Sequence, residues 1–287
     1  MIAMADTAIR LPESRDGWAS FFGRYARVVL VANSDAVDMA TLAARYGDGT
    51  LFVFFNKVFK VLDAPFGRPS LLVARSSHAG ANILYRREVE SVLRLLRGPQ
   101  FFGIANLRAG GAEVFSPAQA FGDVPVGYLD LASTFADFYP ETHLPTSGFA
   151  LAFWLTEACP QLPVVLAGFT ARRSARWKLF HDHEWTFEQI VNRLLVRGGR
   201  LTMDGGEHAG AWDRIAGRIP GVTASDIALV SAEILSERLE GTNRAIDRLM
   251  SLTRLHGRLD AFFRQIKPKT RKQKLAEQAA KKTNVTS

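Results

Sequence analysis

The stretch that decides the fold is VVLVANSDA, from Val28 to Ala36, in which an apolar run ends abruptly in small polar residues. A short, continuous apolar run is typical of a strand buried on both faces of a parallel sheet. The polar residues after it suit a turn into a helix, where Asn33 and Ser34 either cap that helix or bind a phosphate or ribose. The dinucleotide motif G-x-G-x-x-G does not occur here.

Similar apolar segments alternate with helical stretches through the first two hundred residues. This alternation predicts an α/β fold with a single Rossmann-like parallel sheet flanked by helices. The ligand site of such a sheet is expected at the carboxyl ends of its strands. The expected strands are Arg27–Ala32, Leu51–Asn56, Ser70–Arg75, Phe101–Asn106, Pro163–Phe169 and Arg200–Met203, and the expected helices are Val37–Tyr46, Ile83–Leu96, Phe149–Ala158 and Trp185–Val196.

The hydrophobic pattern of the sequence changes after Pro220. Apolar residues recur there at helical spacing, after a candidate N-cap at Ser225. Every seventh residue from Ala245 to Ile266 is apolar, which permits a coiled-coil seam in a homodimer, and packing of the helix on its own domain is the alternative. Gly241 and Gly257 are possible breaks. The expected domains are a catalytic α/β domain at 1–220, a helical region packed on it at 221–265, and a basic, disordered tail at 266–287.

Composition places the chain among ordinary globular proteins. It has 287 residues, of which 47% are hydrophobic and 22% charged. The longest wholly apolar run, Phe149 to Leu155, is too short to cross a bilayer, and the N-terminal residues lack a signal-peptide pattern. Cys159 is the single cysteine, which excludes an intramolecular disulfide and a cysteine-rich zinc site. We therefore expect a cytoplasmic protein.

The net charge of +8 is concentrated in the C-terminal tail. Residues 264–287 contain eight basic residues and one acid, whereas residues 1–263 contain 28 basic and 27 acidic residues. The tail has no interleaved aromatic residues, and the chain has no zinc or recognition-helix motif, so we expect no nucleic-acid partner. The tail is either a solvated segment without a partner or a peripheral attachment to anionic lipid at the inner face of the membrane.

Two further segments place polar residues where a ligand could bind. Asn56 ends the apolar strand 51–56, where it either closes a turn or holds a phosphate oxygen. Thr146, Ser147 and Gly148 precede an apolar helix, whose free N–H groups and positive dipole end favour a carboxylate or phosphate. The alternative is an ordinary N-cap at Thr146 or Ser147. We expect Gly148 to let a ligand approach the backbone closely.

Histidine and acidic residues gather between residues 181 and 188, in HDHEWTFE. This composition suggests either acid–base catalysis or a metal site, but the zinc spacing H-E-x-x-H is absent. His183 lies at an expected helix start, where the positive helix end keeps its ring neutral and suits it to act as a general base. His181 is the rival base. A surface histidine without a catalytic role is the alternative.

Taken together and in this order, these segments resemble the motifs of the sialyltransferase superfamily, the CMP-sugar-dependent glycosyltransferases of eukaryotes and their bacterial relatives. Val28–Val37 resembles the long sialylmotif, with alanine in place of its glycine. Pro145–Phe149 resembles the small sialylmotif, and Val164–Phe169 resembles the strand that follows it. His183 and Glu188, five positions apart, resemble the very small motif. The resemblance covers roughly residues 27–200.

The resemblance implies a Rossmann-like fold related to the GT-A glycosyltransferases, and transfer of an acidic sugar from its CMP donor with inversion at the anomeric carbon. For the donor, it implies that Asn33 and Ser34 contact the phosphate and the ribose and that Asn56 helps to hold the molecule. It implies that Thr146, Ser147 and Gly148 bind the sugar carboxylate or the phosphate. For catalysis, it implies that His183 is the base, with His181 as its rival, and that Glu188 supports the local geometry.

The resemblance also bears on cofactors, partners and setting. A CMP leaving group carries one phosphate and needs less neutralisation by a divalent metal, so we expect no metal and no other cofactor. The basic linker Arg172–Lys178 could close over the donor as a lid. The donor sugar is sialic acid or 3-deoxy-octulosonic acid (Kdo), and the acceptor is a glycan or glycolipid of bacterial surface polysaccharide or lipo-oligosaccharide synthesis. Acceptor specificity is expected in loops 76–85 and 116–143.

Two alternatives stay open. One is a transferase of the same fold that uses another nucleotide sugar, which metal dependence would distinguish. The other is a non-catalytic scaffold that assembles at a membrane through the C-terminal helix and the basic tail, and whose membrane association His183→Ala would leave unchanged.

Overall fold

The computed structural model describes residues 10–75, 82–171, 182–204 and 223–266. The chain divides into two compact units, Met1–Glu207 and His208–Ser287, and each is described by itself. Loop residues 76–81, the basic linker 172–178, His181 and the tail from residue 267 onward lie outside the described residues.

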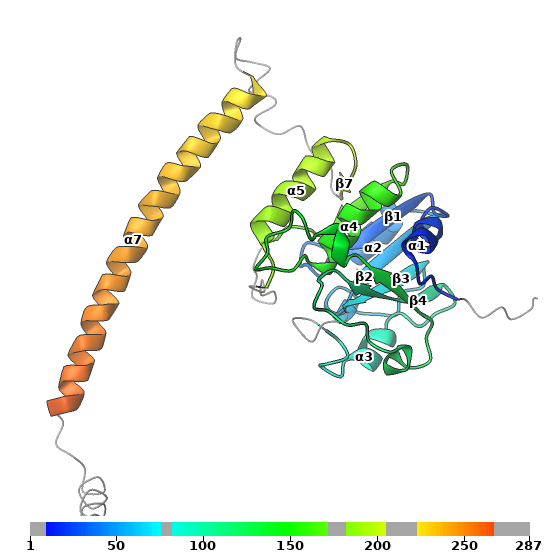
Figure 1. The fold of residues 1–287 in the computed structure, drawn as a ribbon, viewed down its shortest axis with the longest axis horizontal. Coiled ribbons are helices and arrows are strands. Elements are labelled where there is room, and N and C mark those ends of the chain that lie inside the picture. Colours follow the sequence, from blue (N-terminus) through cyan, green and yellow to red (C-terminus); the bar gives the residue numbers. More distant parts are fainter. Residues whose placement is uncertain (1–9, 76–81, 172–181, 205–222, 267–287) are drawn as a thin grey trace, which may run out of the picture. The chain divides into compact units, whose positions relative to one another are not determined.

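The first unit is built on one sheet of seven strands, in the order β5-β4-β3-β2-β1-β6-β7 (Figure 1). All six neighbouring pairs are parallel. The predicted Rossmann-like α/β architecture, a single parallel sheet flanked by helices with a helical C-terminal region, is therefore confirmed. The strands are β1 Arg27–Val31, β2 Thr50–Phe55, β3 Ser70–Arg75, β4 Phe101–Arg108, β5 Val126–Asp130, β6 Val164–Ala167 and β7 Thr202–Met203.

Apolar cores lie on both faces of this sheet, because successive side chains of a strand point to opposite faces. Leu30 and Val53 belong to one core, and their neighbours Val31 and Phe54 belong to the other. The first core is covered by α1, α4 and α5, and the second by α2 and α3. The helices of this unit are α1 Arg15–Phe22, α2 Met39–Arg45, α3 Val89–Leu93, α4 Ser147–Ala158 and α5 Trp185–Arg197, with short 3-10 turns η1 Val58–Lys60, η2 Ala118–Phe121 and η3 Ala132–Thr134.

Three expectations about local structure need correction. Sequence reasoning missed α1, which buries Trp18 and Phe22 completely, and the edge strand β5. The helix expected over Ile83–Leu96 is only the short α3. The Asn82 side chain accepts hydrogen bonds from the N–H groups of Leu84 and Tyr85 and holds a turn there, and Arg87 adopts a positive φ of 57° before α3 starts.

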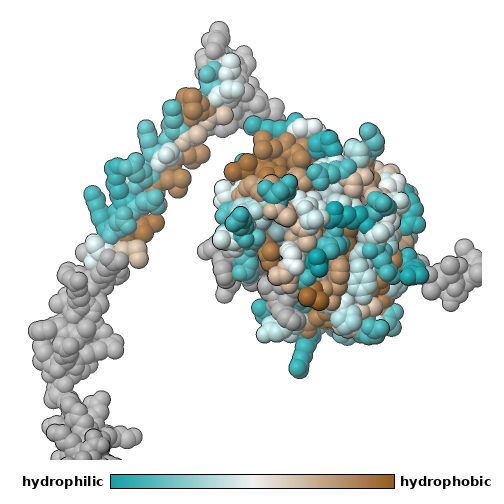
Figure 2. Space-filling model, in the orientation of Figure 1, coloured by the Kyte–Doolittle hydropathy of each residue, from teal (hydrophilic) through white to brown (hydrophobic). Residues whose placement is uncertain are grey.

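The second unit contains one continuous helix, α7, Ala224–Ile266. It begins with a capping box in which Thr223 and Asp226 bond each other's N–H groups, so the N-cap is Thr223 and the expectation of Ser225 was wrong. Gly241 and Gly257 do not interrupt the helix. Figure 2 shows apolar residues along one side of its described part and polar residues along another, and exposed apolar side chains include Val230, Ile234, Leu235, Leu239, Ile246 and Leu249.

Whether this apolar face packs on its own domain or forms a coiled-coil seam in a homodimer stays a prediction. The four residues of the possible seam, at every seventh position from Ala245 to Ile266, have side chains that the structure does not describe. No helix in the described parts of the chain is long and apolar enough to cross a membrane.

Gly127 of β5 gives a test of how β5 packs against the segment at Pro12 and against α1. A Cβ atom there would overlap the Pro12 carbonyl and lie 2.7 Å from the Trp18 ring. We therefore expect Gly127→Ala to lower the free energy of unfolding by about 1–3 kcal/mol in urea titrations. The control is Gly47→Ala, which meets no atom within 4 Å. The control should leave stability unchanged or raise it by up to about 1 kcal/mol. Equal effects of both variants would contradict this packing of β5.

Candidate active site

The candidate site lies at the carboxyl edge of the sheet, where the strand order changes direction. The chain runs outward from β1 to β5 and then returns to β6 on the other side of β1. This change of direction is the usual ligand position in open α/β sheets. Asn33 and Ser34 follow β1 at that point, as the sequence predicted.

Asn33 has one half of its side-chain amide engaged and the other half unpaired. Its Nδ2 donates to the Phe55 carbonyl at the end of β2, 2.8 Å away. Its Oδ1 is buried and has no hydrogen-bond partner among the residues that the structure describes. Ser34 Oγ accepts from the N–H of Ala36, so it stabilises the turn after β1. A buried acceptor without a donor is unfavourable, so Asn33 Oδ1 suits a donor group of a ligand.

Asn56 links the end of β2 to the end of β3. Its Oδ1 accepts from the N–H of Arg75 at 3.2 Å, and its own backbone has a positive φ of 44°, which asparagine tolerates better than most residues. The residue is buried, at 8% exposure. Both alternatives for Asn56, turn closure and donor binding, are compatible with this position.

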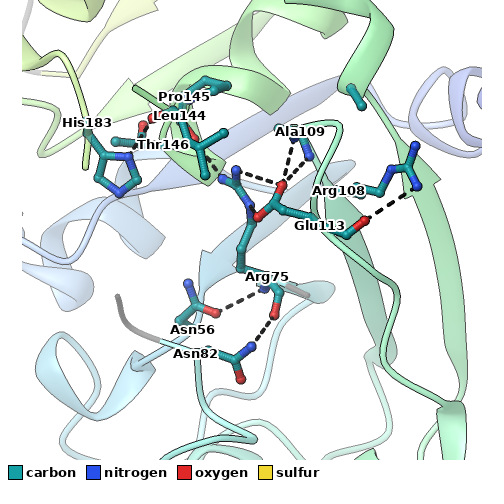
Figure 3. A network of polar contacts seen from close by, with 12 residues as sticks. Asn56, Arg75, Asn82, Arg108, Ala109, Glu113, Leu144, Pro145, Thr146 and His183 are labelled. Carbon is teal, nitrogen blue, oxygen red and sulfur yellow. Dashed lines mark hydrogen bonds and ion pairs between the residues drawn. The ribbon is translucent and has the colours of Figure 1, made fainter. Parts of the chain in front are cut away.

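Arg75, the last residue of β3, forms a buried ion pair with Glu113 in the loop after β4 (Figure 3). Arg75 Nε lies 2.5 Å from Glu113 Oε1, and Nη2 lies 2.9 Å from Oε2. Glu113 Oε2 also accepts from the N–H groups of Ala109 and Gly110, each at 2.8 Å. Arg75 Nη1 donates to the carbonyl of Pro145 at 2.7 Å. The pair therefore reaches the segment that precedes α4.

His183 holds the same segment from another side. Its Nδ1 lies 2.6 Å from the carbonyl oxygen of Leu144, and the Leu144 N–H donates to the Asp182 carbonyl at 2.8 Å. A carbonyl can only accept, so Nδ1 carries the proton and Nε2 of the neutral ring carries the lone pair. Burial lowers the pKa of His183, and the positive charge of Arg75 lowers it further, against the opposing effect of the Leu144 hydrogen bond.

Glu188 is buried on α5 and contacts the start of α4 instead of His183. Its Oε1 accepts from the Thr146 N–H at 2.6 Å and from the Tyr139 hydroxyl at 2.8 Å, and its Oε2 accepts from the Thr146 hydroxyl at 2.7 Å. Burial raises the pKa of Glu188 to about 7, although these three hydrogen bonds act in the opposite direction. Burial beside Glu188 also raises the pKa of Tyr139.

The N-terminus of α4 is buried, with Ser147 at 9% exposure and Gly148 also buried. Thr146 is its N-cap and accepts from the Phe149 N–H. The first N–H groups of the helix, of Ser147 and Gly148, have no intrahelical partner, and within the described ranges the Ser147 hydroxyl makes no hydrogen bond. Glycine at position 148 is also explained by packing, since a Cβ atom there would lie 2.8 Å from the Phe169 ring. The group that comes close to Gly148 in the structure is therefore the Phe169 ring.

The structure brings most of the sequence-predicted residues to one edge of the sheet. Asn33, Asn56, Thr146 and His183 are joined through backbone groups and Arg75 into one hydrogen-bonded network. Sequence reasoning missed three members of the site: Arg75, Glu113 and Tyr139. The only available signal was the placement of Arg75 at the end of an apolar strand. No group of three or more potential metal-ligating side chains occurs in the part of the chain that the structure describes.

Comparison with known proteins finds no relative of this chain. No protein-family model, no curated protein and no solved structure matches the chain.

The raised pKa of Glu188 predicts a pH-dependent stability. From pH 4.5 to about 7 the folded carboxyl keeps a proton that the unfolded chain releases, so its contribution to stability falls as pH rises through this window. At about 1.4 kcal/mol per pKa unit, the loss is about 3 kcal/mol. Urea unfolding between pH 4.5 and 8 should show this loss in the wild type and not in Glu188→Gln.

The exposed Glu141 provides the matched control, because Glu141→Gln should keep the wild-type pH dependence. If Glu188→Gln and the wild type showed the same pH dependence, the burial and protonation described for Glu188 would be incorrect.

Proposed function

We propose that this chain is an inverting glycosyltransferase, which moves sialic acid or Kdo from its CMP donor to a hydroxyl of a glycan or glycolipid. The observation that carries the proposal is the 2.6 Å hydrogen bond between His183 Nδ1 and the Leu144 carbonyl. It fixes the tautomer of the neutral ring, with the lone pair on Nε2, and it ties His183 to a carbonyl that lies two residues before Thr146, the N-cap of α4.

His183 would act as the general base. In the proposed step, Nε2 takes the proton from the acceptor hydroxyl, and the acceptor oxygen forms a bond to the anomeric carbon. The bond from that carbon to the phosphate oxygen breaks on the opposite face, and CMP leaves with the electron pair. A pKa below the usual histidine value keeps the base unprotonated at neutral pH, which supports this role.

The donor would bind between the turn after β1 and the start of α4. The N–H groups of Ser147 and Gly148, together with the Ser147 hydroxyl, suit the sugar carboxylate or the single phosphate. Asn33 Oδ1 needs a hydrogen-bond donor, which a ribose hydroxyl or the cytosine amino group supplies. Asn56 would act through the end of β3, because its side chain already holds the Arg75 N–H.

The setting we propose is the synthesis of bacterial surface polysaccharide or lipo-oligosaccharide at the inner face of the membrane. The tail supports it by its charge, since residues 264–287 hold eight basic residues and one acid.

The test is CMP release by the purified chain, offered CMP-sialic acid and CMP-Kdo separately, with an acceptor extract and with or without EDTA. We expect release from one donor that EDTA does not reduce. His183→Ala should lower the rate at least 100-fold, because general-base catalysis typically contributes 10²–10⁴-fold.

Two further variants make the result specific. Arg10→Ala is the control, because Arg10 forms an exposed surface pair with Glu13 and lies outside both the site network and the expected acceptor loops. Loss of release in His181→Ala, with His183→Ala fully active, would assign the base to His181. Release that EDTA abolished would contradict the expected independence of metal, and release from another nucleotide sugar with none from the two CMP donors would favour the alternative transferase. No CMP binding and no release in a folded sample would contradict the proposal and favour a non-catalytic scaffold.

A further inference from the structure

Three successive residues before α4 are each held by a different part of the chain. Leu144 is held by residues 182 and 183, Pro145 by Arg75, and Thr146 by Glu188. The Pro145 carbonyl and the Thr146 N–H belong to one planar peptide group. Arg75 therefore holds this plane by its oxygen at 2.7 Å, and Glu188 holds it by its nitrogen at 2.6 Å.

We propose that Arg75 and Glu113 are positioning residues, whose buried ion pair fixes the Pro145–Thr146 peptide and thereby places both His183 and the N-terminus of α4. Figure 3 shows the segment Leu144–Thr146 between His183 on one side and the Arg75–Glu113 pair on the other. The proposal rests on the proposed function for its kinetic consequence only, since the placement of His183 is measurable without any activity.

Stability alone is a weak reason for such a pair. The two side chains retain only 8% and 2% of their exposure, and apolar residues of similar size commonly stabilise a fold as well or better. What apolar residues lack is the planar guanidinium fork, which binds a carboxylate with two N–H groups and still has a third nitrogen for a carbonyl. Arg75 uses all three nitrogens in this way.

Glu113 sets the orientation of that fork. Its Oε2 is held by the N–H groups of Ala109 and Gly110, so the carboxylate is attached to the backbone after β4. Arg75 is attached through its own backbone N–H to Asn56. The ends of β2, β3 and β4 thus all contribute to the position of Pro145, and a displacement of this peptide would move Leu144 and the ring of His183 with it.

The first variant is Arg75→Lys, which keeps the charge and loses the fork. A single ammonium group cannot hold Glu113 and Pro145 in the same geometry. We expect kcat for CMP release to fall about 10–100-fold, in the range that a misplacement of about 1 Å produces. The control is Arg97→Lys, in a surface pair with Glu90 and Asp123, and it should keep the wild-type kcat.

The second variant separates positioning from charge neutralisation and guards against misfolding. Arg75→Met combined with Glu113→Gln leaves no unpaired buried charge and keeps an amide oxygen for Ala109 and Gly110. If the pair served only to neutralise itself, this double variant would regain wild-type kcat. If Arg75 holds Pro145, the double variant is as slow as Arg75→Lys although its unfolding transition stays cooperative.

The readout independent of activity is the tautomer of His183, measured by nitrogen–proton correlation NMR of the histidine-labelled chain. In the wild type we expect the proton on Nδ1, as the Leu144 hydrogen bond requires. Both Arg75 variants should shift His183 toward the Nε2–H form, and Arg97→Lys should not. A wild-type tautomer in both variants would overturn the inference, whether or not the chain releases CMP. A shifted tautomer in both Arg75 variants, together with a wild-type chain that releases no CMP, would contradict only the proposed function.

Discussion

One peptide group, between Pro145 and Thr146, connects the strand ends of the sheet to His183 and to the N-terminus of α4. Arg75 binds its oxygen and Glu188 binds its nitrogen, and both side chains are buried. Ionisable groups are rarely buried unless their hydrogen bonds are satisfied. The hydrogen bonds of Arg75 are satisfied by Glu113 and Pro145, and those of Glu188 by Thr146 and Tyr139. The start of α4 therefore cannot shift without loss of several hydrogen bonds.

The electrostatics of the site follow from the same arrangement. Burial near the charge of Arg75 lowers the pKa of His183 and keeps its ring neutral, and the Leu144 carbonyl selects the tautomer. Burial raises the pKa of Glu188 to about 7, so this carboxyl exchanges its proton near neutral pH while it stays bonded to Thr146 and Tyr139. The two groups are coupled through the segment 144–146 and not by direct contact.

Sequence patterns predicted the fold where periodicity is strong and failed where tertiary contacts decide. Buried strands such as β2 and β3 are continuous apolar runs, so their existence was predictable. The edge strand β5 was missed because it has only five residues and carries a glycine at a buried position. This glycine is required because Pro12 and Trp18 leave no room for a Cβ atom. His183, Glu188 and Thr146 were found as local polar motifs. Arg75 and Glu113 are separated by 38 residues and follow no motif, so only the folded chain brings them together.

The central claim is that the start of α4 and His183 form one preorganised site for a CMP-linked sugar. A crystal structure of the chain with CMP tests it most directly. The account predicts phosphate oxygens within hydrogen-bond distance of the Ser147 and Gly148 N–H groups, a donor on Asn33 Oδ1, and an unchanged hydrogen bond between His183 and Leu144. CMP bound away from this edge of the sheet, or no bound CMP at saturating concentration, would contradict it.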